Sequence, residues 1–201
     1  KSYDSLTEND IVMVNIDDCS YEGDIKPSSE KWIHADAYRI HPEVNFVVHT
    51  HQSFASAISL SKEKKIEILN GGILGNVIPV AAYGLSSTQK LRGNVADAMG
   101  LYYTSKAFLM KHHGALCIGR DYDEAFKVAS KLEEVSKKIY MDVTAGGITE
   151  YDYDISSFKK KVNKNGSVEI LCTSPYVMAY SMTGKSMRPY IDDLAQITGK
   201  K

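Results

Sequence analysis

The stretch KPSSEKWIHADAYRIHPEVNFVVHTHQ, residues 26–52, contains in one run the start of a helix, a strand and two closely spaced histidines. A helix is expected over residues 29–40, because a proline and two serines precede it and its apolar residues recur at helical spacing. Pro42 ends that helix, and the apolar run over residues 44–50 then predicts a strand. A helix followed directly by a buried strand is typical of an α/β fold.

The rest of the chain continues this alternation of strand and helix patterns. Strands are expected at 11–16 and 77–81, and the apolar runs at 106–110 and 115–119 predict two strands or one bent strand. Helices are expected at 52–61, at 87–100 and from Asp121 to about Tyr140. Asp121 and Glu124 form a capping-box pattern at the head of the last helix. The class is therefore α/β, whereas the short strands leave parallel and mixed pairing equally open.

The length predicts one domain over residues 1–201. The composition does not indicate a binding partner of strong opposite charge. The 24 basic and 25 acidic residues leave a net charge of −1, which favours neither nucleic acid nor an anionic membrane surface. No stretch has the length of a membrane span, and the start shows no secretory leader. The first residue is Lys1 and not Met, so a segment that precedes it is expected to be missing.

Three cysteines, Cys19, Cys117 and Cys172, are odd in number and widely spaced. This pattern argues against a disulfide framework and against a structural zinc knuckle. We therefore expect a cytoplasmic protein.

His49 and His51 are two residues apart at the end of the expected strand. Side chains at positions i and i+2 of a strand lie on one face, about 6.5 Å apart at the backbone, so both imidazoles can reach one cation. The same spacing also suits two strand-end histidines that are exposed or hydrogen-bonded. The pair alone permits a metal site without deciding for it.

A second histidine pair, His112 and His113, follows an apolar strand. Only one of two adjacent side chains can face a given cleft, so this pair offers one further ligand, and spacing does not choose between them. Three histidine ligands leave a fourth position open for substrate or water, which distinguishes a catalytic zinc site from a structural one.

Glu30 is the candidate carboxylate, at the start of the helix over residues 29–40. A glutamate there has an ordinary explanation, because it interacts favourably with the helix dipole. The same helix start is also suited to an anion, since its free N–H groups and the hydroxyls of Ser28 and Ser29 could hold a phosphate. Glu30 would then face the metal as a ligand or proton carrier.

Together with LMKHHGALCIG at residues 109–119, the opening stretch resembles the class II aldolase/adducin family. The similarity extends from LTENDIVMV, residues 6–14, to the helix that ends near Tyr140. It implies a three-layer α/β/α sandwich around a largely antiparallel central sheet. It also implies a homotetramer with active sites at subunit interfaces.

The resemblance assigns one zinc ion per subunit to a set of four ligands: His49, His51, His113 and Glu30. Glu30 would also carry a proton in catalysis, and Ser28 and Ser29 would form part of a phosphate-binding pocket. His112 becomes a structural neighbour. His34 and His41 are expected on the helix surface or in satisfied hydrogen bonds.

The implied activity is that of a metal-dependent aldolase, a lyase that cleaves a ketose or ketose 1-phosphate by retro-aldol chemistry through a metal-stabilised enediolate. The alternatives are a sugar-phosphate dehydratase or 4-epimerase of the same family, and a non-enzymatic adducin-like binding module. The ligand set favours an enzyme, because a binding module has no physical need for it. The family's epimerase carries aspartate at the position of Glu30, which favours the aldolase or the dehydratase.

Three features depart from the family pattern. The loops that complete the phosphate pocket lie before the matching segment, and Ile68 occupies the position of a tyrosine that donates a proton in the aldolases. The C-terminal extension over residues 171–201 is expected to pack on the domain or on a neighbouring subunit. Asp192 and Asp193 in it are expected to cap a helix.

Overall fold

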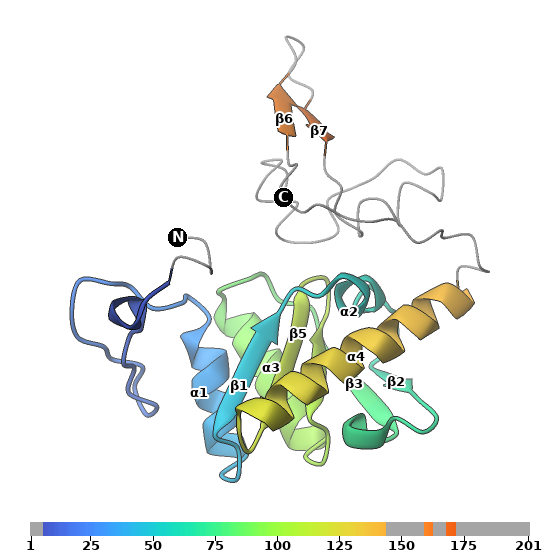
Figure 1. Cartoon of the computed structure of the whole chain (residues 1–201), viewed down its shortest axis with the longest axis horizontal. Helices are drawn as coiled ribbons and strands as arrows, with labels where there is room; N and C mark the ends of the chain where they lie inside the picture. The colour runs from blue at the N-terminus through green and yellow to red at the C-terminus, as the bar shows by residue number, and fades with distance from the viewer. Residues whose placement is uncertain (1–5, 144–158, 163–167, 172–201) are drawn as a thin grey trace.

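The computed structural model describes residues 6–143, 159–162 and 168–171 (Figure 1). The strands of the main sheet are β1 (Phe46–Thr50), β2 (Lys65–Glu67), β3 (Val77–Ala81), β4 (Ala107–Met110) and β5 (Gly114–Gly119). The helices are α1 (Lys31–Ile40), α2 (Ser53–Ile58), α3 (Gln89–Leu101) and α4 (Tyr122–Val143), with 3₁₀ turns η2 (Glu8–Asp10) and η3 (Gly72–Leu74). Two further strands, β6 (Lys159–Val162) and β7 (Val168–Leu171), pair with each other in antiparallel fashion.

The main sheet has the strand order β1-β5-β4-β3-β2. Its pairs are antiparallel except for β3 with β4, which run parallel. The predicted largely antiparallel sheet is therefore confirmed. Because β5 follows β4 in a tight hairpin and pairs with β1, the end of β1 lies beside the β4–β5 turn, with Thr50 opposite Ala115.

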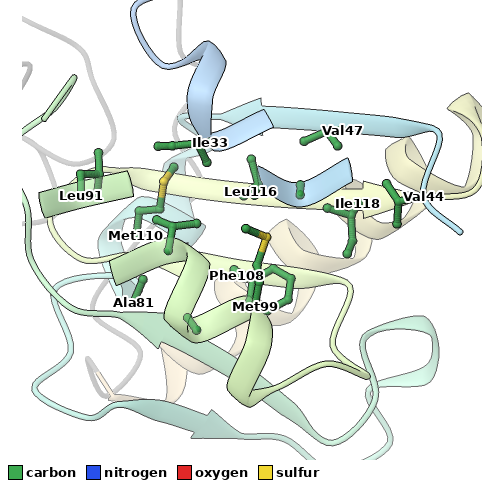
Figure 2. Close-up of a cluster of buried hydrophobic side chains, with 13 residues drawn as sticks. Ile33, Val44, Val47, Ala81, Leu91, Met99, Phe108, Met110, Leu116 and Ile118 are labelled. Carbon is green, nitrogen blue, oxygen red and sulfur yellow. The ribbon is translucent and has the colours of Figure 1, made fainter. Parts of the chain in front are cut away.

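Helices cover both faces of this sheet, which confirms the three-layer arrangement (Figure 1). Successive side chains of a strand point to opposite faces of the sheet, so Phe108 and Leu116 face one side while Leu109 and Cys117 face the other. On the first side, α1 and α3 contribute Ile33, Leu91, Val95 and Met99 to a buried cluster (Figure 2). On the second side, α2 and α4 contribute Ala55, Ile58, Val128 and Leu132.

The start of α4 shows a cap that matches half of the predicted pattern. Asp121 Oδ1 accepts a hydrogen bond from the Glu124 N–H at 2.8 Å, as expected of a helix cap. The Glu124 carboxylate does not close the capping box; it accepts from the backbone N–H of Arg120 at 2.7 Å, from the Arg120 guanidinium and from Lys106 Nζ. These donors lower the pKa of Glu124 to about 2.

The predicted buried strand over residues 11–16 is wrong. Only an isolated bridge joins Val14 to Tyr21, and Ile11 and Met13 are 69% and 85% exposed. Apolar residues make a strand only where a neighbouring strand satisfies their backbone groups, and the described residues supply none there. The short strand β2 was not predicted, because three residues are too few to show alternation.

Two further expectations concern the ends of the chain. Residues 172–201 of the predicted C-terminal extension, with Asp192, Asp193 and Cys172, lie outside the described residues. Across the ranges that are described, no helix combines the length and the apolar character needed to cross a membrane.

Candidate metal centre

Three imidazole rings meet where β1 ends beside the β4–β5 turn. His49 Nε2 lies 2.9 Å from His51 Nε2 and 3.2 Å from His113 Nε2, and the His51 and His113 nitrogens are 3.3 Å apart. His49 belongs to β1 and His51 follows it, whereas His113 comes from the turn. The antiparallel pairing of β1 with β5 thus brings together imidazole rings that are more than sixty residues apart in the sequence.

The turn itself decides which histidine of the 112–113 pair joins the cluster. His112 has a φ of +62°, in the left-handed region that bulky residues rarely adopt, and its ring packs against Tyr83 at 5.4 Å. His113, only 3% exposed, faces the other two histidines. The choice left open by spacing is therefore made by the backbone conformation of the turn.

Gly114 is required by the close approach of β1 to this turn. A Cβ atom at position 114 would lie 2.4 Å from the Thr50 carbonyl oxygen and 2.7 Å from His51 Cδ2. Such separations are shorter than any ordinary carbon–oxygen contact. The absence of a side chain at this position allows the histidines to converge.

Glu30 completes the cluster from the N-terminal end of α1. Its Oε2 lies 3.2 Å from His49 Nε2 and 3.3 Å from His113 Nε2, and the residue is 8% exposed. Burial alone would raise the pKa of this carboxyl, but the His113 and His49 imidazoles lower it to well below its ordinary range. Glu30 is therefore an anion that faces the imidazole nitrogens of His49 and His113.

The three imidazole nitrogens, with Glu30 Oε2 beside two of them, fit a divalent transition-metal ion. Zinc binds imidazole nitrogen at about 2.1 Å, which places neighbouring tetrahedral ligand atoms about 3.4 Å apart. The separations of 2.9 to 3.3 Å among the described donors are close to that value. His49 Nδ1 also contacts the Ala115 carbonyl oxygen at 2.9 Å, and as a donor there it would leave the Nε2 lone pair for a metal.

The predicted phosphate-binding serines lie next to Glu30 and are exposed. Ser28 Oγ accepts a hydrogen bond from the Glu30 N–H at 3.2 Å, and Ser29 Oγ lies 2.7 Å from Ser87 Oγ. Their hydroxyls therefore lie beside the backbone of Glu30 and the Ser87 side chain. Their role in phosphate binding stays a prediction.

The two remaining histidines, His34 and His41, differ in their surroundings. Burial and the nearby His49 lower the pKa of His34 to about 4, so its ring is neutral at pH 7. His41 is fully buried, and neither of its ring nitrogens has a hydrogen-bond partner in the described part of the chain. The expectation of a surface or satisfied position is thus wrong for His41, whose ring packs against Tyr103 and whose Nδ1 lies 3.6 Å from Glu43 Oε1.

Sequence patterns missed the contacts that hold the other oxygen of Glu30. Glu30 Oε1 accepts hydrogen bonds from Ser86 Oγ at 3.0 Å and from the Ser87 N–H at 3.2 Å. The available signal was a polar turn directly before Thr88, the N-cap of α3.

Ile68, at the position of the family's tyrosine, is 8% exposed, and its side chain carries no hydrogen-bond donor.

Comparison with known proteins places this geometry in a family. The model of the class II aldolase and adducin N-terminal domain matches residues 1–140. The chain belongs to the class II aldolase and adducin family. The predicted resemblance is therefore confirmed.

Two relatives within the family show what similar chains do. The L-fuculose phosphate aldolase of Escherichia coli strain K12 is 32% identical over 145 residues, which cover 71% of this chain and 65% of that protein. A 5-methylthioribulose-1-phosphate/5-deoxyribulose-1-phosphate aldolase of Rhodospirillum rubrum is 31% identical over 137 residues, or 67% of this chain and 60% of that one. The chain thus spans somewhat less than two thirds of the length of these family members.

Solved structures agree with the fold. An L-fuculose 1-phosphate aldolase superposes with a TM-score of 0.60 at 22% identity, over 90% of this chain and 75% of that one. The L-fuculose-1-phosphate aldolase of Thermus thermophilus gives a TM-score of 0.56 at 25% identity, over 71% and 74% of the two chains. The fold described above is thus that of class II aldolases.

Proposed function

We propose that the chain is the catalytic domain of a metal-dependent class II aldolase that cleaves a ketose 1-phosphate by a retro-aldol reaction. One observation carries the proposal: the ring nitrogens of His49, His51 and His113 converge into a group that could hold a metal ion, and Glu30 Oε2 lies within 3.3 Å of two of them. A binding module gains nothing from such a set, whereas carbon–carbon cleavage next to a carbonyl needs stabilisation of the developing enediolate, which a bound cation can supply.

The four side chains would divide the chemistry between them. The three histidines would hold the cation, with Zn²⁺ the first choice for imidazole ligands and other divalent transition metals possible in principle. A cation bound there supplies a Lewis acid that polarises the substrate carbonyl. As the C3–C4 bond breaks, its electron pair would pass to C3 and the C4 hydroxyl would give its proton to a base. Glu30, an anion in the free site, would take up a proton from solvent and deliver it to C3, so that dihydroxyacetone phosphate and an aldehyde leave.

The exposure of the three histidines supports access for a substrate. His113 is buried and His49 is partly buried, whereas His51 is exposed, so the donor set opens to solvent on the side of His51. Ser28 and Ser29 stand beside Glu30, where a phosphate could meet the N-terminal end of α1. Both relatives named above carry a sugar phosphate in their names, which supports the same substrate class here.

We also propose a cytoplasmic homotetramer with active sites at subunit interfaces. Cys19 and Cys117 are both free and buried, in keeping with a reducing compartment. Ile68 offers no side chain that could exchange a proton with the oxygen of the aldehyde, so a tyrosine from elsewhere in the assembly would have to serve. Light scattering coupled to size-exclusion chromatography measures the assembly directly.

The experiment that tests this function measures metal content and the release of dihydroxyacetone phosphate from a panel of ketose 1-phosphates on one sample. The Glu30→Gln variant keeps the shape of the side chain and removes its charge, so turnover should fall by at least about a hundredfold while metal stays bound. Glu22→Gln makes the same change at an exposed position and serves as the control. Full metal in His49→Ala and His113→Ala would refute the metal site, and bound metal without cleavage would redirect the assignment to dehydration or epimerisation.

A further inference from the structure

The turn between β3 and α3 holds one oxygen of Glu30 while the other oxygen faces the histidines. Ser86 Oγ and the Ser87 N–H both donate to Oε1, at 3.0 and 3.2 Å. Oε2 is the atom that lies 3.2 and 3.3 Å from two imidazole nitrogens. The two oxygens of one carboxylate therefore have separate partners.

This division matters because the terminal torsion of a glutamate is soft. Rotation about that bond has broad minima, so an unrestrained carboxylate would sample many orientations beside a metal. Two donors on Oε1 remove that freedom and fix the direction in which Oε2 points. Hydrogen bonds to an ionised acceptor are among the stronger ones, so the restraint is substantial.

The turn is itself fixed against α1 and α3. Ser87 has a φ of +63°, a conformation that persists only where its surroundings enforce it. Gly84 packs so tightly on α3 that a Cβ there would lie 2.4 Å from the Leu91 nitrogen. Arg92 of α3 donates to Asp36 of α1 at 2.5 and 2.9 Å, which holds the two helices side by side.

We infer that Ser86 and Ser87 are positioning residues of the proposed metal centre, which act through Glu30 by presenting Oε2 to the cation. This inference rests on the proposed metal site, but its test does not depend on which sugar is cleaved. Ser86 works through its hydroxyl, which can be removed. Ser87 works through its backbone N–H, which only proline would remove, and proline cannot adopt the positive φ of this position.

The test is a double-mutant cycle on Zn²⁺ affinity, measured by competition with a chromogenic chelator. Ser86→Ala should weaken Zn²⁺ binding about tenfold, the size expected for the loss of one hydrogen bond to a charged group. In a Glu30→Ala background the same substitution should change affinity less than about twofold, because its partner is gone. Ser86→Thr retains a hydroxyl and should restore most of the affinity.

A matched control separates this role from a loss of packing. Ser59 is fully buried, donates to the Ser56 carbonyl oxygen at 2.7 Å and lies at the C-terminal end of α2, opposite the end that follows His51. Ser59→Ala should therefore lower thermal stability without weakening Zn²⁺ binding. An equal effect of Ser86→Ala with and without Glu30, or no effect in either background, would overturn the positioning role alone. Failure of the unmutated protein to bind Zn²⁺ would overturn the metal centre itself.

Discussion

Substitution of Gly114 by alanine is the sharpest single perturbation of the histidine cluster. The added Cβ would lie 2.4 Å from the Thr50 carbonyl oxygen, whereas a carbon and an oxygen normally stay about 3.4 Å apart. The end of β1 would therefore have to move about 1 Å away from the turn. His49 and His51 would move with it, because they stand on either side of Thr50.

A movement of that size exceeds what a metal site tolerates. Ligand distances in such sites hold to within about 0.2 Å, so a shift of about 1 Å would detach one or two histidines. We expect Gly114→Ala to weaken Zn²⁺ binding at least about a hundredfold and to lower the free energy of unfolding by about 1–3 kcal/mol through overpacking.

The assay combines chelator competition with chemical denaturation, and a second glycine provides the control. Gly93 is exposed on α3, and a Cβ there would meet nothing within 4 Å. Gly93→Ala should stabilise the fold by about 0.5–1 kcal/mol, the usual gain in a helix interior, and leave Zn²⁺ binding unchanged. Metal affinity within about threefold of the unmutated protein in Gly114→Ala would refute the claim that glycine is needed for convergence.

Three further predictions concern the pH dependence of stability and the β4–β5 turn that contains His112. Folding lowers the pKa of His34 from 6.5 to about 4, so the stability it contributes is present above pH 6.5 and is lost as pH falls toward 4. In denaturation of the metal-free protein, the free energy of unfolding should fall by up to about 1.4 kcal/mol per pH unit in this range, and His34→Gln should reduce this pH dependence. Glu124→Gln should lower the free energy of unfolding by about 1–2 kcal/mol at pH 7. Because folding lowers the pKa of Glu124 from 4.5 to about 2, the difference in stability between variant and unmutated protein should shrink as pH falls from 4.5 to 2, as measured by denaturation. His112→Gly should keep the full metal content, by elemental analysis, and change stability by less than about 1 kcal/mol, whereas metal loss would make His112 a ligand.

Hydrophobic patterning predicts most strands and helices of this fold because it reports burial directly, whereas the three layers were implied by the family resemblance. The pattern over residues 115–119 appears as β5, whose alternate residues face the two helical layers. The expected strand over 11–16 shows the limit of that signal. Its apolar residues satisfy the pattern, but pairing depends on a neighbour that the local sequence does not specify.

The candidate site was predictable only in part for the same reason. The spacing of His49 and His51 predicts two imidazoles that can share a cation, and their nitrogens lie 2.9 Å apart. The choice of His113 over His112 depends on the backbone of one turn, and the Ser86 contact to Glu30 depends on how α1 packs against α3. Periodicity carries no information on either.

The turns that complete the site are also places where the backbone is held in an unfavourable conformation. Among the described residues, φ is positive at four positions other than glycine: Cys19, Asn70, Ser87 and His112. Each such position costs about 1–2 kcal/mol for an ordinary side chain. Two of the four adjoin the metal donors, since His112 precedes His113 and Ser87 donates its N–H to Glu30. A cost of this size persists only where surrounding contacts enforce it, here the β4–β5 pairing and the packing of α1 on α3. The positive φ values at Ser87 and His112 therefore mark the two turns on whose shape a metal centre would depend. Local sequence preference alone does not predict this conformation at either position.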